Sequence, residues 1–230
     1  MILPRPLHSW SLTPRQAVAL QRELASRVVT RGSVPRIRLV AGADLAFTPD
    51  ALQCIAAVVV WDVKARQVVE LQIVRKPVSF PYVAGLLTFR EAPAILTAIR
   101  RLRCEPDAFM FDGHGIAHPR RVGLASHLGL CLDRPSVGCA KTVLVGTCEA
   151  PGLAKGATSP LVDRGERIGL AVRTRDRTKP LYVSVGHRLS LAAAVRITLA
   201  CCDRYRLPEP TRLADKLVRR ARTEPACIPG

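Results

Sequence analysis

Three apolar runs separated by short polar connections constrain the fold of this chain more than any other feature. The runs span residues 37–47, 52–61 and 67–78, and only a few residues separate each run from the next. Connections this short join antiparallel strands, because a parallel pair needs a crossover of about a dozen residues or more. The sequence therefore predicts a three-stranded antiparallel meander.

A longer connection brings the chain back into the same sheet. An apolar run over residues 106–112 follows a predicted helix over residues 90–103, and this crossover allows the fourth strand to lie parallel to the first, in the middle of the sheet. A further helix over residues 119–130 leads to a short fifth strand over residues 135–139. We therefore predict an α/β domain with a mixed sheet flanked by helices.

The remaining sequence adds further elements and shows no internal repeat. We predict a helix capped by Thr13 that begins at Pro14 and runs to about residue 29, a surface excursion over 147–167, a hairpin of strands 168–173 and 181–185, a helix capped by Ser190 that reaches residue 203, and a last helix over 211–220. Residues 1–221 form one predicted domain, and residues 222–230 a flexible tail.

Two carboxylates lie within or directly after predicted strands. Asp44 sits in an otherwise apolar strand with no basic residue within five positions, and Asp112 ends the fourth strand before Gly113 and Gly115. Burying an isolated carboxylate is costly unless it is paired or bound to a metal ion. Asp44 could instead be satisfied by backbone donors or a distant arginine, and Asp112 could be a simple helix cap. On adjacent strands, the two could share one cation.

The net charge of the chain indicates which kind of partner such a cation would contact. Lys and Arg total 35 against 18 Asp and Glu, a net charge of +17, which favours DNA, RNA or an anionic membrane as partner unless it reflects a general abundance of arginine. Carboxylates in so basic a chain make sense if Mg²⁺ lies between them and a phosphate. Glu91 and Asp215 are further candidates, although Glu91 could merely complement a helix dipole. Lys141 could stabilise charge on the phosphate, and His118 could contact it or transfer a proton.

Several other classes of protein are disfavoured. The sequence contains no G-x-S-x-G motif, no P-loop and no dinucleotide-binding fingerprint after a strand. The eight cysteines form no C-x-x-C pair, which argues against a structural zinc site and favours reduced thiols. No apolar run approaches the ~20 residues of a membrane span, and the N-terminus does not resemble a signal peptide. We expect a soluble, cytoplasmic protein.

Six segments carry a resemblance to a known family. They are Val40–Asp44, Pro81–Glu91, Asp112–Gly123, Pro135–Lys141, Gly186–His187 and Arg206–Arg212. With these residues in this order, the chain resembles the endonuclease V family of deoxyinosine-directed nucleases. The resemblance implies a ribonuclease-H-like fold whose central mixed sheet has five strands in the order 3-2-1-4-5. It also implies Mg²⁺-dependent hydrolysis, with Mn²⁺ able to substitute, of the second phosphodiester bond 3′ to deoxyinosine, which leaves 3′-hydroxyl and 5′-phosphate ends and initiates DNA repair.

The resemblance also assigns roles to individual residues. Asp44, Glu91 and Asp112 bind metal and are catalytic, while Lys141 and His118 support the phosphate and the attacking water. The expected contacts to the nucleic acid come from Tyr82 as a strand-separating wedge and from Gly85, Gly113, Gly138, Arg120 and Asp215, with the glycines near Asp112 and Gly138 lining a pocket for the extruded base. At the wedge, Pro81-Tyr-Val-Ala-Gly85 departs from the usual Pro-Tyr-Ile-Pro-Gly. Loss of the second proline makes this loop less rigid, which bears on how strictly the lesion is discriminated.

The implied partner is DNA that contains deoxyinosine or another deaminated base. We expect the protein to act as a monomer and not to associate with a membrane. Two alternatives remain open. The chain could be an endoribonuclease for inosine in RNA, because contacts to a 2′-hydroxyl cannot be read from the sequence. It could also bind deaminated nucleic acid without cutting it, although every candidate carboxylate and Lys141 are present.

Overall fold

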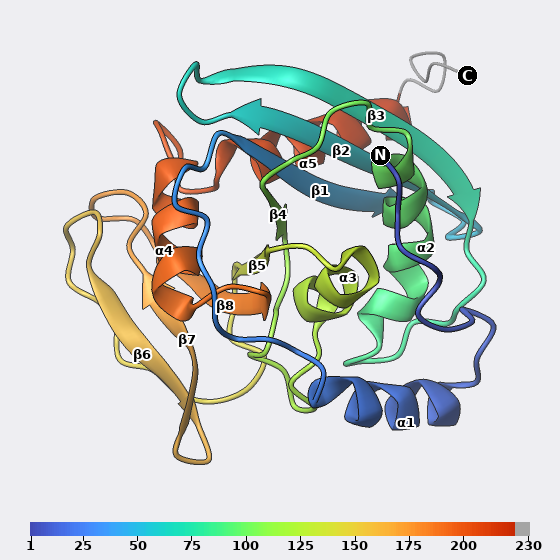
Figure 1. Ribbon diagram of the computed structural model, residues 1–230, viewed down its shortest axis with the longest axis horizontal. Helices are drawn as coiled ribbons and strands as arrows, with labels where there is room; N and C mark the ends of the chain where they lie inside the picture. The colour runs from blue at the N-terminus through green and yellow to red at the C-terminus, as the bar shows by residue number, and fades with distance from the viewer. Residues whose placement is uncertain (224–230) are drawn as a thin grey trace.

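The computed structural model describes residues 1–223 of the chain, with helices packed on both faces of one mixed sheet (Figure 1). The sheet has eight strands in the order β3-β2-β1-β4-β5-β8-β7-β6. The strands are β1 (Leu39–Phe47), β2 (Gln53–Asp62), β3 (Gln67–Pro77), β4 (Ala108–Phe111), β5 (Ser136–Ala140), β6 (Thr158–Asp163), β7 (Glu166–Val172) and β8 (Leu181–His187). The helices are α1 (Pro14–Ala25), α2 (Leu87–Arg100), α3 (Leu124–Leu132), α4 (Leu191–Ala200) and α5 (Glu209–Thr223). The first five strands have the predicted order.

The pairing of β1 sets the centre of the sheet. β1 pairs antiparallel with β2, and β2 with β3, as their short connections predicted. On its other side β1 pairs in parallel with β4, which pairs in parallel with β5. Helix α2 connects β3 to β4, so the predicted meander, crossover and central fourth strand are confirmed.

The sheet extends further than the sequence predicted. β5 pairs antiparallel with β8, β8 with β7 and β7 with β6, so the predicted late hairpin is confirmed and joins the main sheet. The prediction of an irregular excursion over residues 147–167 was wrong, because this segment contains β6 and the start of β7. β6 is the edge strand, where a proline such as Pro160 is tolerated. The prolines and glycines within residues 147–167 obscured the strand pattern in the sequence.

The ends of helices α1, α4 and α5 can be compared with the predictions. Thr13 caps α1 and Pro14 is its first residue, as predicted, and Thr13 forms a capping box with Gln16. The predicted Ser190 cap of α4 is also present. However, α1 ends at Ala25 rather than near residue 29, and α5 runs to Thr223, so that it includes the start of the predicted tail. The rest of that tail, residues 224–230, lies outside the described residues. No helix within residues 1–223 is long and apolar enough to cross a membrane.

The start of α2 differs from the prediction. The helix begins at Leu87 rather than at residue 90, because it continues directly from the loop that contains Tyr82. Pro93 lies inside the helix, and Glu91 lies in its second turn.

The start of α3 was also placed wrongly. The helix begins at Leu124 after Gly123, whereas residues 119–123 were predicted to be helical. Residues 112–123 instead form a loop that folds back on itself, with the amide of Gly123 donating to the carbonyl oxygen of Gly115 (2.9 Å). A Cβ on Gly115 would lie 1.9 Å from the carbonyl oxygen of Val185, so only glycine lets this loop pack against β8.

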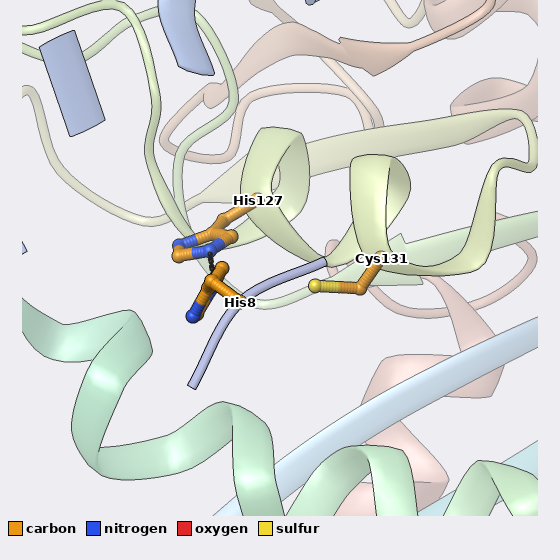
Figure 2. Close-up of side chains that lie close together, drawn as sticks. All are labelled: His8, His127 and Cys131. Carbon is orange, nitrogen blue, oxygen red and sulfur yellow. Dashed lines mark hydrogen bonds between the residues drawn. The ribbon is translucent and has the colours of Figure 1, made fainter. Parts of the chain in front are cut away.

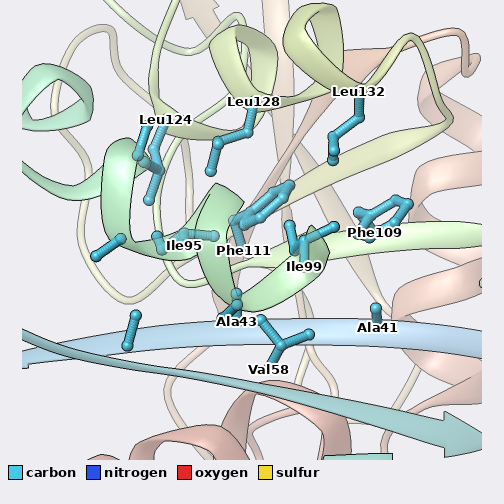
Figure 3. Packing of buried hydrophobic residues seen from close by; sticks show 14 of the residues in the cluster. Ala41, Ala43, Val58, Ile95, Ile99, Phe109, Phe111, Leu124, Leu128 and Leu132 are labelled. Carbon is cyan, nitrogen blue, oxygen red and sulfur yellow. The ribbon is translucent and has the colours of Figure 1, made fainter. Parts of the chain in front are cut away.

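Both faces of the central strands are buried. Figure 3 shows Phe109 and Phe111 of β4 packed against isoleucines of α2 and leucines of α3. Met110 points to the opposite face, where it joins the cluster that contains residues of α4. Helix α5 covers β2 on that same face through a separate cluster. The central strands are thus enclosed between α2 and α3 on one side and α4 and α5 on the other, which fixes the ends of β1 and β4.

Candidate active site

Asp44 and Asp112 come from neighbouring parallel strands. Ala43 of β1 pairs with Phe111 of β4, and the next residues are Asp44, within β1, and Asp112, directly after the end of β4. Equivalent positions on adjacent parallel strands lie side by side. Burial and then the charge of Asp112 raise the pKa of Asp44 to about 7. The structure therefore brings together the two carboxylates that the sequence singled out.

Glu91 reaches the same place from α2. Because it lies in the second turn, the alternative that it merely complements the helix dipole loses its basis. Burial, followed by the charges of Asp44 and Asp112, raises the pKa of Glu91 to about 8. Three carboxylates from β1, α2 and the end of β4 thus lie close enough to repel one another.

The last helix adds a fourth carboxylate. Asp215 of α5 forms an ion pair with Arg219 (Oδ1–Nε 2.8 Å), and its charge also raises the pKa of Asp44. Helix α5 can approach β1 because Gly42 has no side chain, since a Cβ there would lie 2.3 Å from the carbonyl carbon of Pro210. The structure places Asp215 with the carboxylates, while its predicted contact with the substrate stays a prediction.

Basic side chains neutralise only part of the negative charge of these carboxylates. Lys141, which directly follows β5, contacts Asp112 through its Nζ and remains partly exposed. Within residues 1–223, neither Asp44 nor Glu91 forms an ion pair. Two partly buried carboxylates with raised pKa values and no cationic partner would be stabilised by a divalent cation. Their oxygen atoms are ligands suited to Mg²⁺.

A cavity of about 240 Å³ lies next to Asp112. It is lined by Tyr82, Val83, Ala84, Gly85, Leu87, Thr88, Gly113, His114, His118, Gly123, Leu124 and Leu144. These residues come from the loop before α2, the first turn of α2, the loop after β4, the start of α3 and the segment after β5. The side chain of Tyr82 is 74% exposed, so its ring is available at the rim for stacking. Carboxylates beside an apolar cavity of this kind can act on a phosphate next to a bound flat ring.

Comparison with known proteins identifies the family. The sequence profile of endonuclease V matches residues 22–216, which include every site residue described above. The chain belongs to the endonuclease V family. It is therefore an enzyme, a deoxyribonuclease of this family. Endonuclease V of Gloeobacter violaceus is 50% identical to it, over 97% of this chain and 93% of the relative.

Solved structures of endonuclease V agree with the fold. The crystal structure of the Streptomyces avermitilis protein has a TM-score of 0.90 and 42% identity, and the match covers 95% of this chain and 97% of that one. A variant of Ciona intestinalis endonuclease V, in complex with a 23mer DNA containing an inosine followed by a ribo-adenosine, has a TM-score of 0.82 and 26% identity over 93% and 99% of the two chains. The predicted ribonuclease-H-like α/β fold is confirmed.

The loop that carries Tyr82 is held at Gly85. The carbonyl oxygen of Gly85 accepts hydrogen bonds from His118 Nε2 (3.1 Å), Arg120 Nη2 (2.8 Å) and Gln21 Nε2 (3.1 Å). Gly85 has a φ of +76°, and a Cβ there would lie 2.7 Å from Arg120 Nη2, so the position requires glycine. These three donors restrain the end of the loop from which the second proline of the family is missing.

His118 acts within this clamp as a neutral donor. Burial and then the charge of Arg120 lower its pKa to about 4. Its Nδ1 accepts a hydrogen bond from the backbone amide of Arg120 (3.1 Å), so the ring carries its proton on Nε2, the atom that contacts Gly85. Both His118 and Arg120 thus already hold the loop, and the phosphate and DNA contacts predicted for them stay predictions.

Of the glycines predicted to line the base pocket, Gly113 lines the cavity and Gly138 does not. Gly138 is not among the lining residues, because the backbone of the loop covers it, and a Cβ there would lie 2.6 Å from the carbonyl oxygen of Gly113. The structural need for glycine at position 138 is therefore the close packing of the loop on β5.

Sequence reasoning missed three residues that shape the site. His114 and Leu144 line the cavity, and His114 Nε2 lies 3.0 Å from the carbonyl oxygen of Thr142. The Gly-His-Gly pattern directly after Asp112 was the available signal for His114, whereas nothing marked Leu144. Gln21, which is buried on α1 and donates to the carbonyl oxygen of Gly85, lies in a predicted helix where no feature of the sequence marked it.

Proposed function

We propose that this enzyme hydrolyses the second phosphodiester bond 3′ to a deoxyinosine in DNA, leaves 3′-hydroxyl and 5′-phosphate ends, and thereby initiates the repair of deaminated adenine. The observation that carries the proposal is the cluster of Asp44, Glu91 and Asp112 beside the cavity with Tyr82 at its rim. The carboxylates suit chemistry at a phosphate, and the cavity suits one base taken out of the duplex. The inosine-containing DNA in the Ciona intestinalis complex supports the same lesion.

Binding begins with the phosphates and ends with the base. The net charge of +17 attracts the DNA backbone, so affinity should fall steeply as salt concentration rises. A weak inosine pair costs less to open than a normal pair, which favours its extrusion. The ring of Tyr82 stacks in the space that the base leaves, and the base enters the cavity beside Gly113 and His114.

Asp44 and Glu91 fit a divalent cation because burial and the neighbouring carboxylates raise their pKa values, and within residues 1–223 neither forms an ion pair. Asp44, Glu91 and Asp112 would hold Mg²⁺, and Mn²⁺ would substitute for it. When bound, the ion supplies stabilisation of charge on the phosphate and a water of lowered pKa. Lys141, partly exposed beside Asp112, donates from Nζ to a phosphate oxygen and so adds to the stabilisation of the developing charge.

Inosine in RNA is a second candidate substrate. In the Ciona intestinalis complex the nucleotide after the inosine is a ribo-adenosine, so a 2′-hydroxyl is accommodated beside the lesion in that relative. The same accommodation in this chain would permit an inosine-specific endoribonuclease activity.

A matched set of end-labelled oligonucleotides tests both candidates. The set comprises duplex DNA with one deoxyinosine, the same DNA with a ribo-adenosine after the inosine, RNA with one inosine, and adenine-containing controls, each incubated with Mg²⁺, Mn²⁺ or excess EDTA. We expect metal-dependent nicking of the inosine DNA and intact controls. Preferential cleavage of RNA would favour the second candidate. Tight inosine binding without product at any metal concentration would contradict both.

A further inference from the structure

A second group of metal-ligating side chains lies away from the carboxylates. His127 and Cys131 are four residues apart on α3, the spacing that places two side chains on one face of a helix. His8 approaches them from the segment that precedes α1 (Figure 2). One ring nitrogen of each histidine and the Sγ of Cys131 lie within 4.8 Å of one another.

The orientation of His8 suits a metal ligand. Its Nδ1 lies 2.7 Å from the carbonyl oxygen of Ser9, which can only accept, so Nδ1 carries the proton. Its Nε2 therefore presents a lone pair, and it lies 2.7 Å from Nε2 of His127. A histidine that donates from one nitrogen to a backbone carbonyl and offers the other to a cation is the usual arrangement of a metal-binding imidazole.

His127 has a nitrogen that no protein group satisfies. Its side chain is fully buried, and within residues 1–223 its Nδ1 has no hydrogen-bond partner. When Nε2 donates its proton to His8, the lone pair of Nδ1 is left buried and unused, at a cost of about 1–3 kcal/mol. A buried imidazole that has one unsatisfied nitrogen and belongs to a cluster with a second imidazole and a thiol points to a ligand rather than to packing alone.

We propose that His8, His127 and Cys131 form a binding site for a transition-metal ion with a filled d shell, Zn²⁺ or Cu⁺. Nitrogen and sulfur donors select such ions, whereas the oxygen donors of the carboxylate cluster select Mg²⁺. Bonds of about 2.0 Å to nitrogen and 2.3 Å to sulfur would place ligand atoms roughly 3.3–3.8 Å apart, which small side-chain rotations achieve from the observed spacing. Three ligands complete a trigonal Cu⁺ site or leave Zn²⁺ one position for water.

The surroundings hold the ligands and leave a path for the ion. The ring of Trp10 lies 4.4 Å from that of His8, and the ring of Phe89 lies 5.1 Å from that of His127, measured between centroids. Cys131 also lines a separate cavity of about 210 Å³, together with residues of the N-terminal segment and α2. This cavity gives the thiol a route for metal entry.

A bound ion would fasten distant parts of the chain. His8 and His127 are separated by 119 positions, so the ion would pin the N-terminal segment onto α3. Phe89 packs on both rings and lies on α2, two residues before Glu91. The site would therefore stabilise the packing between α2 and α3 behind the carboxylate cluster, without supplying a ligand to that cluster.

Metal titration of the metal-free full-length protein tests the proposal. Zn²⁺ is added against a chromophoric chelator, Cu⁺ is added without oxygen against a Cu⁺-specific chelator, and Co²⁺ reports sulfur ligation through its thiolate charge-transfer band. His8→Ala and Cys131→Ser are the test variants, because both side chains are less buried than that of His127. Cys148→Ser is the matched control, since this thiol lies outside the cluster.

The expected result is one tightly bound ion per chain, together with a melting temperature that rises with the concentration of free ion. Both test variants should weaken binding by more than the about 10–100-fold typical of changes around a metal site, and Cys131→Ser should abolish the cobalt band. Cys148→Ser should behave as the unaltered protein. Whichever of Zn²⁺ and Cu⁺ survives chelator competition identifies the ion. Absence of stoichiometric binding of either ion, or binding that His8→Ala and Cys131→Ser leave unchanged, would overturn the proposal.

Discussion

Replacing Glu91 with glutamine should stabilise the metal-free enzyme, even though we expect the same change to remove catalysis. Glu91→Gln preserves the shape of the side chain and removes a charge that burial and the carboxylates of Asp44 and Asp112 disfavour. Folding raises the pKa of Glu91 from its ordinary 4.5 to about 8, so between these values the folded state keeps a proton that the unfolded state releases. The stability that Glu91 contributes is therefore complete below pH 4.5 and is lost as the pH rises through 8.

The size of the effect follows from the same two pKa values. At pH 7, about 2.5 pH units above the ordinary pKa of Glu91, ionisation of the unfolded state alone lowers the free energy of unfolding by about 3 kcal/mol. Above pH 8 the loss approaches about 5 kcal/mol, as an upper limit because Asp44 shares the repulsion. Glutamine has no such loss. For a chain of this length, about 3 kcal/mol corresponds to a rise in melting temperature of about 6–12 °C.

Thermal and urea unfolding in EDTA at pH 5, 7 and 9 measure this difference. The advantage of Glu91→Gln should be small at pH 5 and should grow toward pH 9. Glu149→Gln, at an exposed glutamate, is the matched control and should leave stability nearly unchanged. Added Mg²⁺ should stabilise the unaltered enzyme more than the variant. A variant that is less stable at pH 7 and 9, or a stability difference independent of pH, would refute the account of the carboxylate cluster.

Three further predictions concern the cluster and the loop at its side. Asp112→Asn should lower the nicking rate by about 10³-fold and leave the affinity for the inosine duplex unchanged, because the loss of roughly 4 kcal/mol of charge stabilisation acts on the transition state. Single-turnover kinetics measure the rate, and gel-shift titration measures the affinity. Tyr82→Ala should weaken binding of the inosine duplex by about 1–3 kcal/mol with no change in melting temperature, because the ring is exposed, and Tyr82→Phe should restore it. His118→Ala should lower the free energy of unfolding by about 2 kcal/mol, because the hydrogen bond to Gly85 is lost. In the unaltered enzyme, the activity between pH 6 and 8 should show no titration of His118, since its pKa is about 4.

The centre of the sheet could be predicted because its signals are local. Connection lengths fixed which strands run antiparallel, and the crossover helix fixed the parallel pair that carries Asp44 and Asp112. An unpaired carboxylate in an apolar strand was informative because burial leaves few ways to satisfy it. The identity of the family, the wedge and the base pocket came from resemblance rather than from periodicity.

Features that depend on distant contacts could not be read from the sequence. Pro119 suggested a helix start, but the loop before α3 is fixed by the approach of Gly115 to β8, and Arg121 adopts a φ of +60° there. The clamp at Gly85 joins α1 to two loops far apart in the chain. The cluster of His8 with α3 likewise joins segments 119 positions apart, and it contains no C-x-x-C spacing that would have marked it.

The most direct test of the proposed function is the position of the nick in a duplex that contains one deoxyinosine. End-labelled strands are resolved to single nucleotides after incubation with Mg²⁺, and the ends are tested by ligation and by phosphatase. The proposed function predicts one nick, at the second phosphodiester bond on the 3′ side of the inosine, with a 3′-hydroxyl and a 5′-phosphate and with no product in EDTA. Cleavage on the 5′ side, cleavage independent of the inosine, or full activity in EDTA would contradict the account.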